Sequence, residues 1–412
     1  MSRRVIELEE VPVDSGAKLA SDPSLSLDLE RLVQPMTAEE FLADYYSRSC
    51  CHVLGQPDKF SRLLRWVELN RILESTPLGP PQLMLYVSGA PVVPDQYVEY
   101  RTRDRTVLPR INVKGFTDQL RRGATMILNH IHELHLPLSI LADSLERRFS
   151  ARVGINLYAA WRNHRGYNLH RDPHDVFILQ LSGRKRWLLH GHEGSASKVP
   201  SWDRILNQGD LLYIPRGEWH SAAPLDEPSL HLTISVENPT IPDFLSWLSE
   251  ELKSSDLAQL SISKFSSSED RSALLDILKK TVLDAIDAHF LDRYFESVDS
   301  RRGAPVRFSL PWSATPEALP PDAAATVRLR SRRAPSMTVD EQDRAVILKI
   351  GSKTWRFPLA MRNVLEVIRD GRDHSVEELV SSGSGVLGSA MTRAFLATLV
   401  KEGILARSPN SD

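Results

Sequence analysis

A series of short β-rich runs between Val153 and Glu237 constrains the fold more than any other feature of this chain. Short, evenly spaced strands separated by turns are typical of antiparallel sheets packed as a sandwich or barrel, which is how jelly rolls and cupins are built. We therefore expect this stretch to be the candidate catalytic core. The runs are GINLYAAW, DVFILQLSG, KRWLLHG, GDLLYIPRG and SLHLTISVE.

Length and composition predict a globular protein with more than one unit. The chain has 412 residues, which exceeds what one hydrophobic core usually organises, so two or three packed units are expected. Hydrophobic residues make up 42% and charged residues 25%, which argues against disorder throughout. The formal net charge of −2 creates no global field toward nucleic acid or an anionic membrane, so a partner must be recognised locally.

The cysteines and the apolar runs indicate a soluble cytoplasmic protein. Cys50 and Cys51 are adjacent and are the only cysteines, so they cannot build a disulfide framework. The first residues include two arginines but no apolar run behind them, unlike a secretory signal. No stretch approaches the ~18 consecutive apolar residues that span a bilayer, so no membrane partner is expected.

Four parts are expected along the chain, with boundaries at changes of pattern. Residues 1–35 lack sustained periodicity and should form an N-terminal arm, and residues 36–240 should form the catalytic domain. Residues 241–300 return to helical spacing with a large apolar face, which is commonly buried against a second copy, so we expect a homodimer. A Pro- and Ala-rich linker and a winged-helix-like domain should occupy residues 301–412.

The segment before the β-rich core has mixed patterns. Apolar residues three and four apart predict short helices on either side of the strand-like CCHVLG at residues 50–55, a plausible lid over the core. Residues 93–115 are charged and irregular. Residues 116–149 have helical spacing, with a break expected at Pro137.

Two histidines and one carboxylate in the β-rich region form a candidate metal site. His170 and Asp172 are two apart, and this spacing on a strand would turn both side chains to the same face. His220 follows a strand-like run that ends in a Pro/Gly turn. Two His and one carboxylate leave several positions of an octahedral iron open, as non-haem Fe(II) oxygenases require, whereas a structural zinc site would use four protein ligands.

The motifs around these residues resemble the JmjC-domain ribosomal oxygenases, a family of cupin-fold protein hydroxylases. The matching elements are N-x-Y, H-x-D, D-V-F-x-L-Q, G-x-K/R-x-W and a distal His after a P-x-G turn. The sharp motifs fall between residues 156 and 235, while the resemblance in architecture extends over about residues 36–407. It implies an α+β chain with a double-stranded β-helix core, a helical dimerisation module and a C-terminal winged-helix domain.

The resemblance also implies roles for individual residues. By position, His170, Asp172 and His220 would bind Fe(II), and Lys185 would meet the distal carboxylate of the co-substrate 2-oxoglutarate, with O2 as the second co-substrate. A fixed cation would offset the desolvation of a buried dicarboxylate. Three further residues align with cofactor-facing positions, namely Asn156, Tyr158 and Ser235. The chain departs from many relatives after the tyrosine, where Ala159, Ala160 and Trp161 begin a basic and aromatic loop.

Several other features have a functional and a structural interpretation, and we favour the structural one for each. His174 is the nearest rival ligand, but the triad is complete without it, and His231 fits a core or supporting histidine. The cluster HIHELH at residues 130–135 is not HExxH and should hold solvated or capping histidines. GSGVLG at residues 383–388 follows a predicted helix and reads as a turn. The arginines of VRLRSRR at residues 327–333 should have a structural role or bind a protein, so nucleic acid is not the expected partner.

Three hypotheses for function remain open. The first is an Fe(II)- and 2-oxoglutarate-dependent hydroxylase of a protein side chain, with an Arg or His β-carbon of a ribosomal protein as the expected target. The second directs the same chemistry to a biosynthetic peptide or small metabolite, because of the loop that begins at Ala159. The third is a non-enzymatic cupin and winged-helix regulator. Demethylation in place of hydroxylation is not distinguished by the sequence.

Overall fold

The chain divides into two compact units, which comprise residues 1–238 and 239–412. The computed structural model describes residues 6–8, 28–161, 167–191, 199–225, 227–253, 259–287, 289–301, 306–315, 319, 325–333 and 335–407.

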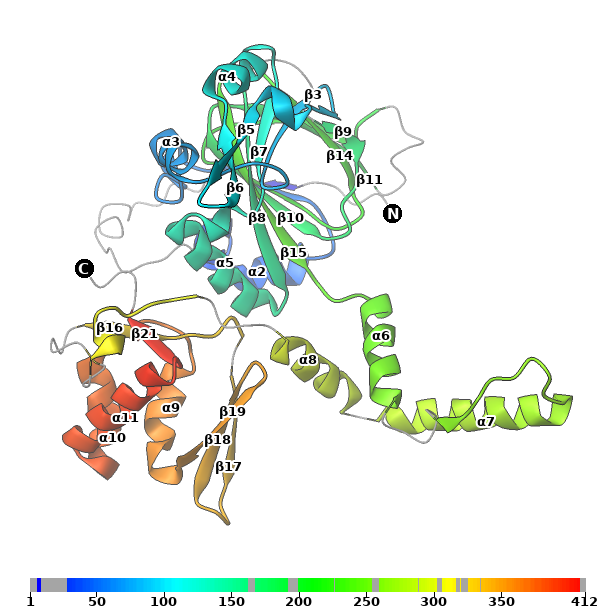
Figure 1. Cartoon of the computed structure of the whole chain (residues 1–412), viewed down its shortest axis with the longest axis vertical. Helices are drawn as coiled ribbons and strands as arrows, with labels where there is room; N and C mark the ends of the chain where they lie inside the picture. The colour runs from blue at the N-terminus through cyan, green and yellow to red at the C-terminus, as the bar shows by residue number, and fades with distance from the viewer. Residues whose placement is uncertain are drawn as a thin grey trace. The chain divides into compact units, whose positions relative to one another are not determined.

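Two sheets form the centre of the first unit, and all their strand pairs are antiparallel except β1 with β2 (Figure 1). The larger has nine strands in the order β1-β2-β13-β10-β15-β8-β7-β3-β4, and the smaller has the order β12-β11-β14-β9. Strands distant in sequence are neighbours, as the pairing of β10 with both β13 and β15 shows. Their bounds are β1 Ile6–Leu8, β2 Cys51–Val53, β3 Leu83–Val87, β4 Ala90–Pro91, β7 Thr125–Leu128, β8 Arg152–Ala160, β9 Tyr167–His170, β10 Asp175–Ser182, β11 Lys185–Gly191, β12 Trp202–Leu206, β13 Leu211–Ile214, β14 Trp219–Pro224 and β15 Ser229–Glu237.

Alternation along the long strands separates two hydrophobic cores. On β8 and β15, residues such as Leu157 and Leu232 face a core that the helices cover, and the residues between them face the smaller sheet. The second core, with Trp187, Trp202 and Ile178, lies between the two sheets. Figure 1 shows α3 and α5 on one side of β8 and β10, and β9, β11 and β14 on the other. The helices of this unit are α1 Leu29–Val33, α2 Ala38–Asp44, α3 Trp66–Ser75, α4 Val113–Arg121 and α5 Leu136–Phe149, with 3-10 turns η1 Pro94–Gln96 and η2 Ile131–Glu133.

The N-terminal half of this unit corrects four expectations. The arm expected at residues 1–35 contains α1, because Leu29 and Leu32 bury their side chains. Residues 125–128 form β7 within a stretch expected to be helical, because all four are buried against β3 and β8. Pro137 is the second residue of α5 and does not break a helix, since proline is tolerated in a first turn.

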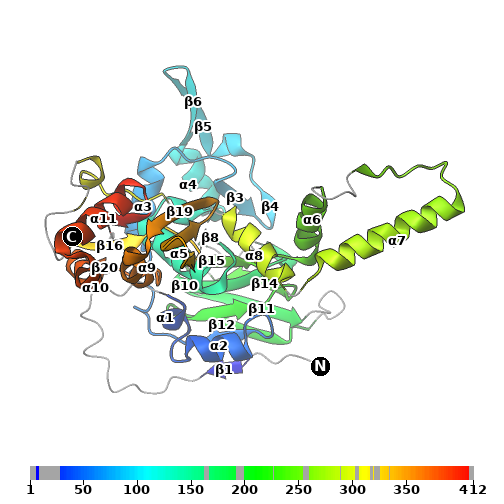
Figure 2. The same ribbon diagram turned by 90° about the horizontal axis from the view of Figure 1, so that it is seen from below.

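The fourth correction concerns residues 93–115, which are not irregular. They include a two-stranded hairpin of β5 Val98–Arg103 and β6 Thr106–Ile111, which Figure 2 shows extending away from the sheets. Tyr100 and Val107 on this hairpin are exposed, so the hydrophobic pattern that marks a strand buried on one face is weak.

Three helices open the second unit. They are α6 Ile241–Leu252, α7 Ser268–Ala285 and α8 Phe290–Ser300. Trp247 and Leu248 of α6 pack against Phe290 and Tyr294 of α8 in a small core. None of the residues of α7 is buried, although the helix carries several leucines and one isoleucine. No helix in the described part of the chain has the length and apolar character needed to cross a membrane.

The remainder of the second unit has its own core. The strands form two three-stranded sheets, β17-β18-β19 and β20-β16-β21, beside helices α9 to α11. Two arginines of VRLRSRR form ion pairs, Arg328 with Asp373 at 2.7 Å and Arg333 with Asp299 at 2.9 Å. The elements are η4 Trp312–Ala314, β16 Thr326–Leu329, β17 Ser336–Asp340, β18 Ala345–Ile350, β19 Lys353–Pro358, η5 Leu359–Met361, α9 Arg362–Ile368, β20 His374–Ser375, α10 Val376–Leu387, α11 Ser389–Lys401 and β21 Leu405–Arg407.

GSGVLG at residues 383–388 is not the turn that we expected. All but its last residue belong to α10, which ends at Leu387. A Cβ atom on Gly383 would lie 2.7 Å from the Thr392 side chain, so this glycine lets α10 approach α11 closely. The motif therefore serves helix packing.

His374 makes the stability of the second unit dependent on pH. Its ring nitrogens lie 2.8 Å from an Asp370 oxygen and 3.1 Å from a Glu378 oxygen. Burial alone would lower the pKa of His374, but the hydrogen bonds to both carboxylates outweigh it and raise the pKa above 6.5. The protonated histidine therefore stabilises the unit fully below pH 6.5, and this contribution is lost as the pH rises through the folded-state pKa.

We expect a His374→Gln variant to lose that pH dependence. Both carboxylates are substantially exposed, so the wild-type change should be no more than about 1 kcal/mol. Hydrogen exchange of residues 362–387, corrected for the intrinsic effect of pH, should show more opening at pH 8 than at pH 6 in the wild type. His289→Gln, which removes an exposed histidine of the same unit, should retain the wild-type difference. Equal pH dependence in the His374 variant and the wild type would contradict this assignment.

Candidate functional site

The structure brings His170, Asp172 and His220 together. His170 is the last residue of β9 and lies opposite His220 of β14. His220 Nε2 is 3.5 Å from Asp172 Oδ2, and His170 Nε2 is 4.0 Å from the same oxygen. One ligand atom from each residue lies within 4.8 Å of the other two, so the three could hold one metal ion.

Asp172 reaches this point by a different route from the one we expected. It does not share a strand with His170, because β9 ends at His170. The Gly217 N–H donates a hydrogen bond to the Asp172 carbonyl oxygen at 2.9 Å, which ties the segment after β9 to the turn before β14. Tertiary contact between two loops, and not strand periodicity, therefore positions the carboxylate.

The ring of His220 is oriented for metal binding. Its Nδ1 lies 3.0 Å from the Glu218 carbonyl oxygen, so Nδ1–H donates and the Nε2 lone pair faces Asp172. Burial, followed by the neighbouring His170, lowers the pKa of His220 to about 4. The imidazole is therefore neutral near pH 7, as a ligand must be.

The triad is open on one side. The His220 side chain is 4% exposed, whereas those of His170 and Asp172 are 39% and 27% exposed. Within the described part of the chain no fourth His, Cys, Asp or Glu joins the group, and His174 is not a member. Three protein donors with a solvent-facing side match the facial arrangement that leaves coordination positions available.

Lys185 places a buried cation on the same side of the large sheet. Its side chain comes from β11, and the residue is 4% exposed. Its Nζ lies 5.9 Å from the Tyr158 ring centroid and 5.7 Å from that of Trp187. Burial lowers the pKa of Lys185 from 10.5 to about 7. None of the described carboxylates forms an ion pair with this ammonium group, so an anion bound beside it would restore its charge.

The other predicted site residues line the same face of β8 and β15. Asn156 and Tyr158 alternate with β8 residues of the helix-covered core, so they face the smaller sheet. Asn156 Oδ1 accepts a hydrogen bond from the His130 N–H at 2.9 Å, and Ser235 Oγ donates to the Gly154 carbonyl at 3.4 Å. Asn156 and Ser235 therefore already hold backbone groups in place.

His231 is a supporting residue beside Tyr158 and Trp187. Its ring stacks on Tyr158 with centroids 4.9 Å apart, and Trp187 meets it edge-on at 5.6 Å. Burial, with a contribution from the Lys185 charge, holds the pKa of His231 well below 6.5. A neutral, stacked histidine therefore holds the two aromatic rings near Lys185 in place.

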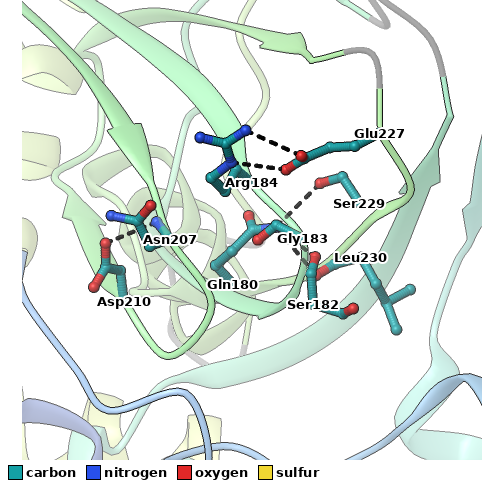
Figure 3. A network of polar contacts seen from close by, with 9 residues as sticks. All are labelled: Gln180, Ser182, Gly183, Arg184, Asn207, Asp210, Glu227, Ser229 and Leu230. Atoms are coloured by element: carbon teal, nitrogen blue, oxygen red, sulfur yellow. Dashed lines mark hydrogen bonds and ion pairs between the residues drawn. The ribbon is translucent and has the colours of Figure 1, made fainter.

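Gln180 anchors the turn that precedes Lys185, a role we did not assign from the sequence. The side chain is fully buried, and its Nε2 donates to the Ser182 carbonyl at 2.9 Å and to Ser229 Oγ at 3.0 Å. Figure 3 shows this amide between the turn and β15, with the Arg184–Glu227 ion pair beside it. The sequence contained a signal for this role, because a polar glutamine lies on the same strand face as the apolar residues Val176 and Ile178.

We expect Gln180→Leu to destabilise the first unit and weaken 2-oxoglutarate binding. The substitution leaves buried acceptors unsatisfied, which should lower the free energy of unfolding by about 1–3 kcal/mol. Urea denaturation and co-substrate titration would measure both effects. Gln208→Leu, at an exposed glutamine of the same unit, should change either value little. Wild-type stability of Gln180→Leu would contradict the anchoring role.

The HIHELH cluster does not favour a second metal site. His130, His132 and Glu133 lie close enough to share an ion, and residues 131–133 form η2. However, the Ile155 N–H donates a hydrogen bond to His132 Nδ1 at 3.2 Å. A metal at Nε2 would require a proton on Nδ1, which would then face this N–H. His132 is better explained as a partner for the Ile155 N–H, in the part of β8 that β7 does not pair.

Trp161 does not lie beside the triad. It belongs to the helix-covered core on the opposite face of the large sheet, and its ring centroid is 5.8 Å from that of Trp66. Both rings line a cavity of about 400 Å³ with α3 and α4. The following residues 162–166 of the basic loop lie outside the described residues. The sequence departure therefore changes the helix-covered side of the unit at Ala159 and Trp161, whereas Ala160 shares its strand face with Tyr158.

Comparison with known proteins agrees with this geometry. Residues 130–244 match the family model for the JmjC domain. The chain contains a JmjC domain. The match includes the triad, Lys185 and all of β8 to β15. The resemblance inferred from the motifs is thus confirmed.

The chain also has curated relatives. It is similar to the bifunctional lysine-specific demethylase and histidyl-hydroxylase NO66 of Drosophila melanogaster, with 36% identity over 228 residues, 50% of this chain and 33% of that protein. The Dictyostelium discoideum protein of the same name is 25% identical over 256 residues, which cover 57% of this chain and 48% of that protein. The matched region spans about half or less of these relatives.

Solved structures show the same fold. The Escherichia coli ribosomal oxygenase YcfD, in a structure with cobalt and 2-oxoglutarate, superposes with a TM-score of 0.54 at 15% identity. That alignment covers 90% of this chain and 98% of YcfD. The expected cupin-type fold with mixed helices and sheets is therefore confirmed.

Proposed function

We propose that this protein is an Fe(II)- and 2-oxoglutarate-dependent oxygenase in which His170, Asp172 and His220 hold the iron. One observation carries the proposal: the three side chains meet on an open face, with His220 Nε2 already directed at the common point. Iron bound there would supply the oxidation of a C–H bond by O2, coupled to conversion of 2-oxoglutarate to succinate and CO2.

The residues around the triad would bind the co-substrate and exclude water from it. Lys185 would pair with the distal carboxylate of 2-oxoglutarate, and its charged form would be restored by that pairing. Tyr158 lies within reach of the same ammonium group and could donate a hydrogen bond to the carboxylate. Asn156 and Ser235 would act by holding neighbouring backbone and by further hydrogen bonds to the bound molecule.

The substrate would be a side chain of a protein, and we favour a ribosomal protein with an Arg or His β-carbon as the target. The open face of the triad supports a macromolecular substrate, and the names of the relatives include a histidyl-hydroxylase and a ribosomal oxygenase. The relatives' names also include a demethylase. The small-metabolite alternative rests on the loop that begins at Ala159. Trp161 of that loop lies on the opposite face, and residues 162–166 lie outside the described residues.

A mass-spectrometric experiment tests this proposal. The purified protein with Fe(II), 2-oxoglutarate and O2 would be incubated with ribosomal proteins from cells that lack the enzyme. Hydroxylation should add one oxygen mass to a defined peptide, whereas demethylation should remove the mass of a methylene group. Succinate formation without any modified ribosomal peptide would reject the ribosomal substrate and retain the oxygenase chemistry.

We also propose that α7 pairs with a second copy of the chain in a homodimer. The helix buries none of its residues, and Leu275, Leu278 and Leu283 are 52%, 42% and 69% exposed. Apolar helical surface of this kind is usually covered by a partner.

Residues 326–407, with their three helices and β16, β20 and β21, would form a winged-helix-like domain that docks protein. Arg328 already forms an ion pair with Asp373, so its charge is less available to phosphates and nucleic acid is a less favoured partner.

Replacing Leu275 and Leu283 by glutamate should halve the molar mass in solution. Charges at the centre of an apolar interface carry a desolvation penalty that exceeds what a typical contact contributes, so dissociation should be complete at micromolar concentration. Light scattering after size exclusion would measure the mass. Lys280→Glu, which changes charge at an exposed position of the same helix, should leave the dimer intact. A monomeric wild-type protein would reject the proposal.

A further inference from the structure

Two arginines flank the metal triad on the loops that carry its ligands. Arg171 lies between His170 and Asp172 in sequence, and its guanidinium carbon is 5.4 Å from the Trp219 ring centroid. Arg216 lies in the turn before β14, and its Nη2 donates to the Pro173 carbonyl at 2.7 Å. With the Gly217 bond to Asp172, these contacts lock the two loops together. Both cations therefore have defined positions on these two loops, residues 171–174 and 215–218, which we call the rim.

The exposed charge of this rim is positive. Arg171 is exposed, and no carboxylate of the described residues forms an ion pair with it. The same two loops contain two acidic residues, but Asp172 faces the triad and Glu218 is only 6% exposed. Stacking on an aromatic ring leaves the N–H donors of a guanidinium available to an incoming acceptor. The rim thus offers an exposed, charged donor one residue away from each of the ligands His170 and Asp172.

We propose that Arg171, supported by Trp219, is a specificity-determining residue that binds a carboxylate next to the side chain to be oxidised. The inference rests on the proposed protein oxygenase function and adds a substrate class, namely segments with Asp or Glu beside the target. A planar guanidinium matches a carboxylate in shape and charge, and a basic neighbour would be repelled. Within a basic substrate protein, Arg171 would select a locally acidic segment.

Peptide binding tests this inference separately from catalysis. The probes are synthetic peptides with a central His or Arg whose neighbouring positions carry Glu, Gln or Lys. Binding is measured by fluorescence polarisation with Mn(II) and 2-oxoglutarate in the absence of O2. The wild type should bind Glu peptides roughly fivefold more tightly than Gln peptides, the range of an exposed ion pair. Arg171→Gln should lose this preference, and Arg171→Glu should prefer Lys peptides.

A matched control and a fold check accompany these variants. Arg110→Gln removes an exposed cation of the same unit on the separate β5–β6 hairpin, so it should retain the wild-type preference. Mn(II) titration would check that each Arg171 variant keeps an intact triad. Equal binding of the three peptide classes by the wild type, or an unchanged preference in Arg171→Glu, would overturn the inference. Either result could stand beside hydroxylation of a ribosomal peptide, so failure of the inference is distinguishable from failure of the proposed function.

Discussion

Asp172→Ala should abolish both iron binding and succinate formation. Loss of the carboxylate leaves two imidazoles to hold the metal and removes the negative charge that lies 3.5 Å from His220 Nε2. Mutation of an outer-shell partner typically weakens metal binding 10–100-fold, so loss of a direct ligand should exceed about a hundredfold. Calorimetric titration with Fe(II) under anaerobic conditions and a succinate assay would measure the two losses.

The matched control for this variant is Asp203→Ala. Asp203 belongs to β12 of the same small sheet and forms an ion pair with Arg186 at the surface. Its removal should leave metal binding and succinate formation near wild-type values. Unchanged succinate formation in Asp172→Ala would reject the oxygenase assignment and revive a non-enzymatic, ligand-sensing role for the JmjC domain.

Lys185→Met should weaken 2-oxoglutarate binding by about a hundredfold while leaving the protein without co-substrate as stable as the wild type or more stable. Truncating one partner of a buried charge pair typically costs 2–5 kcal/mol in binding. In the absence of the dicarboxylate, however, an apolar side chain of similar length avoids the desolvation that lowers the lysine pKa to about 7. Lys114→Met, at an 88% exposed lysine of the same unit, should change neither property.

The same lysine predicts how stability depends on pH. Between pH 7 and 10.5 the unfolded chain holds a proton on Lys185 that the folded protein lacks, so raising the pH through this window favours the folded state. The wild type without 2-oxoglutarate should therefore gain stability relative to Lys185→Met as the pH increases. Urea denaturation at several pH values would measure the difference. A constant difference across the window would show that the folded-state pKa of Lys185 is not depressed.

Much of the JmjC core could be predicted from local patterns, and so could β2 in CCHVLG, whereas β7 and the β5–β6 hairpin could not. The runs that became β8, β10, β11, β13 and β15 combine β-branched or aromatic residues with turns at both ends, so their local and tertiary preferences agree. β7 was missed because residues 125–128 are apolar without alternation and continue a helical pattern. Burial between β3 and β8 decides their conformation.

The candidate site also has one aspect that could be predicted from the sequence and one that could not. The identities of His170, Asp172 and His220 followed from residue chemistry and motif spacing, because a facial metal site needs those donor types. Their convergence did not follow from periodicity. It depends on the pairing of β9 with β14 and on the Gly217 bond to Asp172.

The amino-acid sequence by itself therefore determined the donor set, the β-rich core and the resemblance to JmjC proteins, since these depend on side-chain chemistry and on residues close together in the chain. Only the tertiary structure decided the His220 tautomer, the burial of Lys185, the position of Trp161 on the opposite face and the exposed Arg171 at the rim. Each of these properties arises between segments that are distant in sequence, where desolvation and hydrogen-bond partners are set by packing.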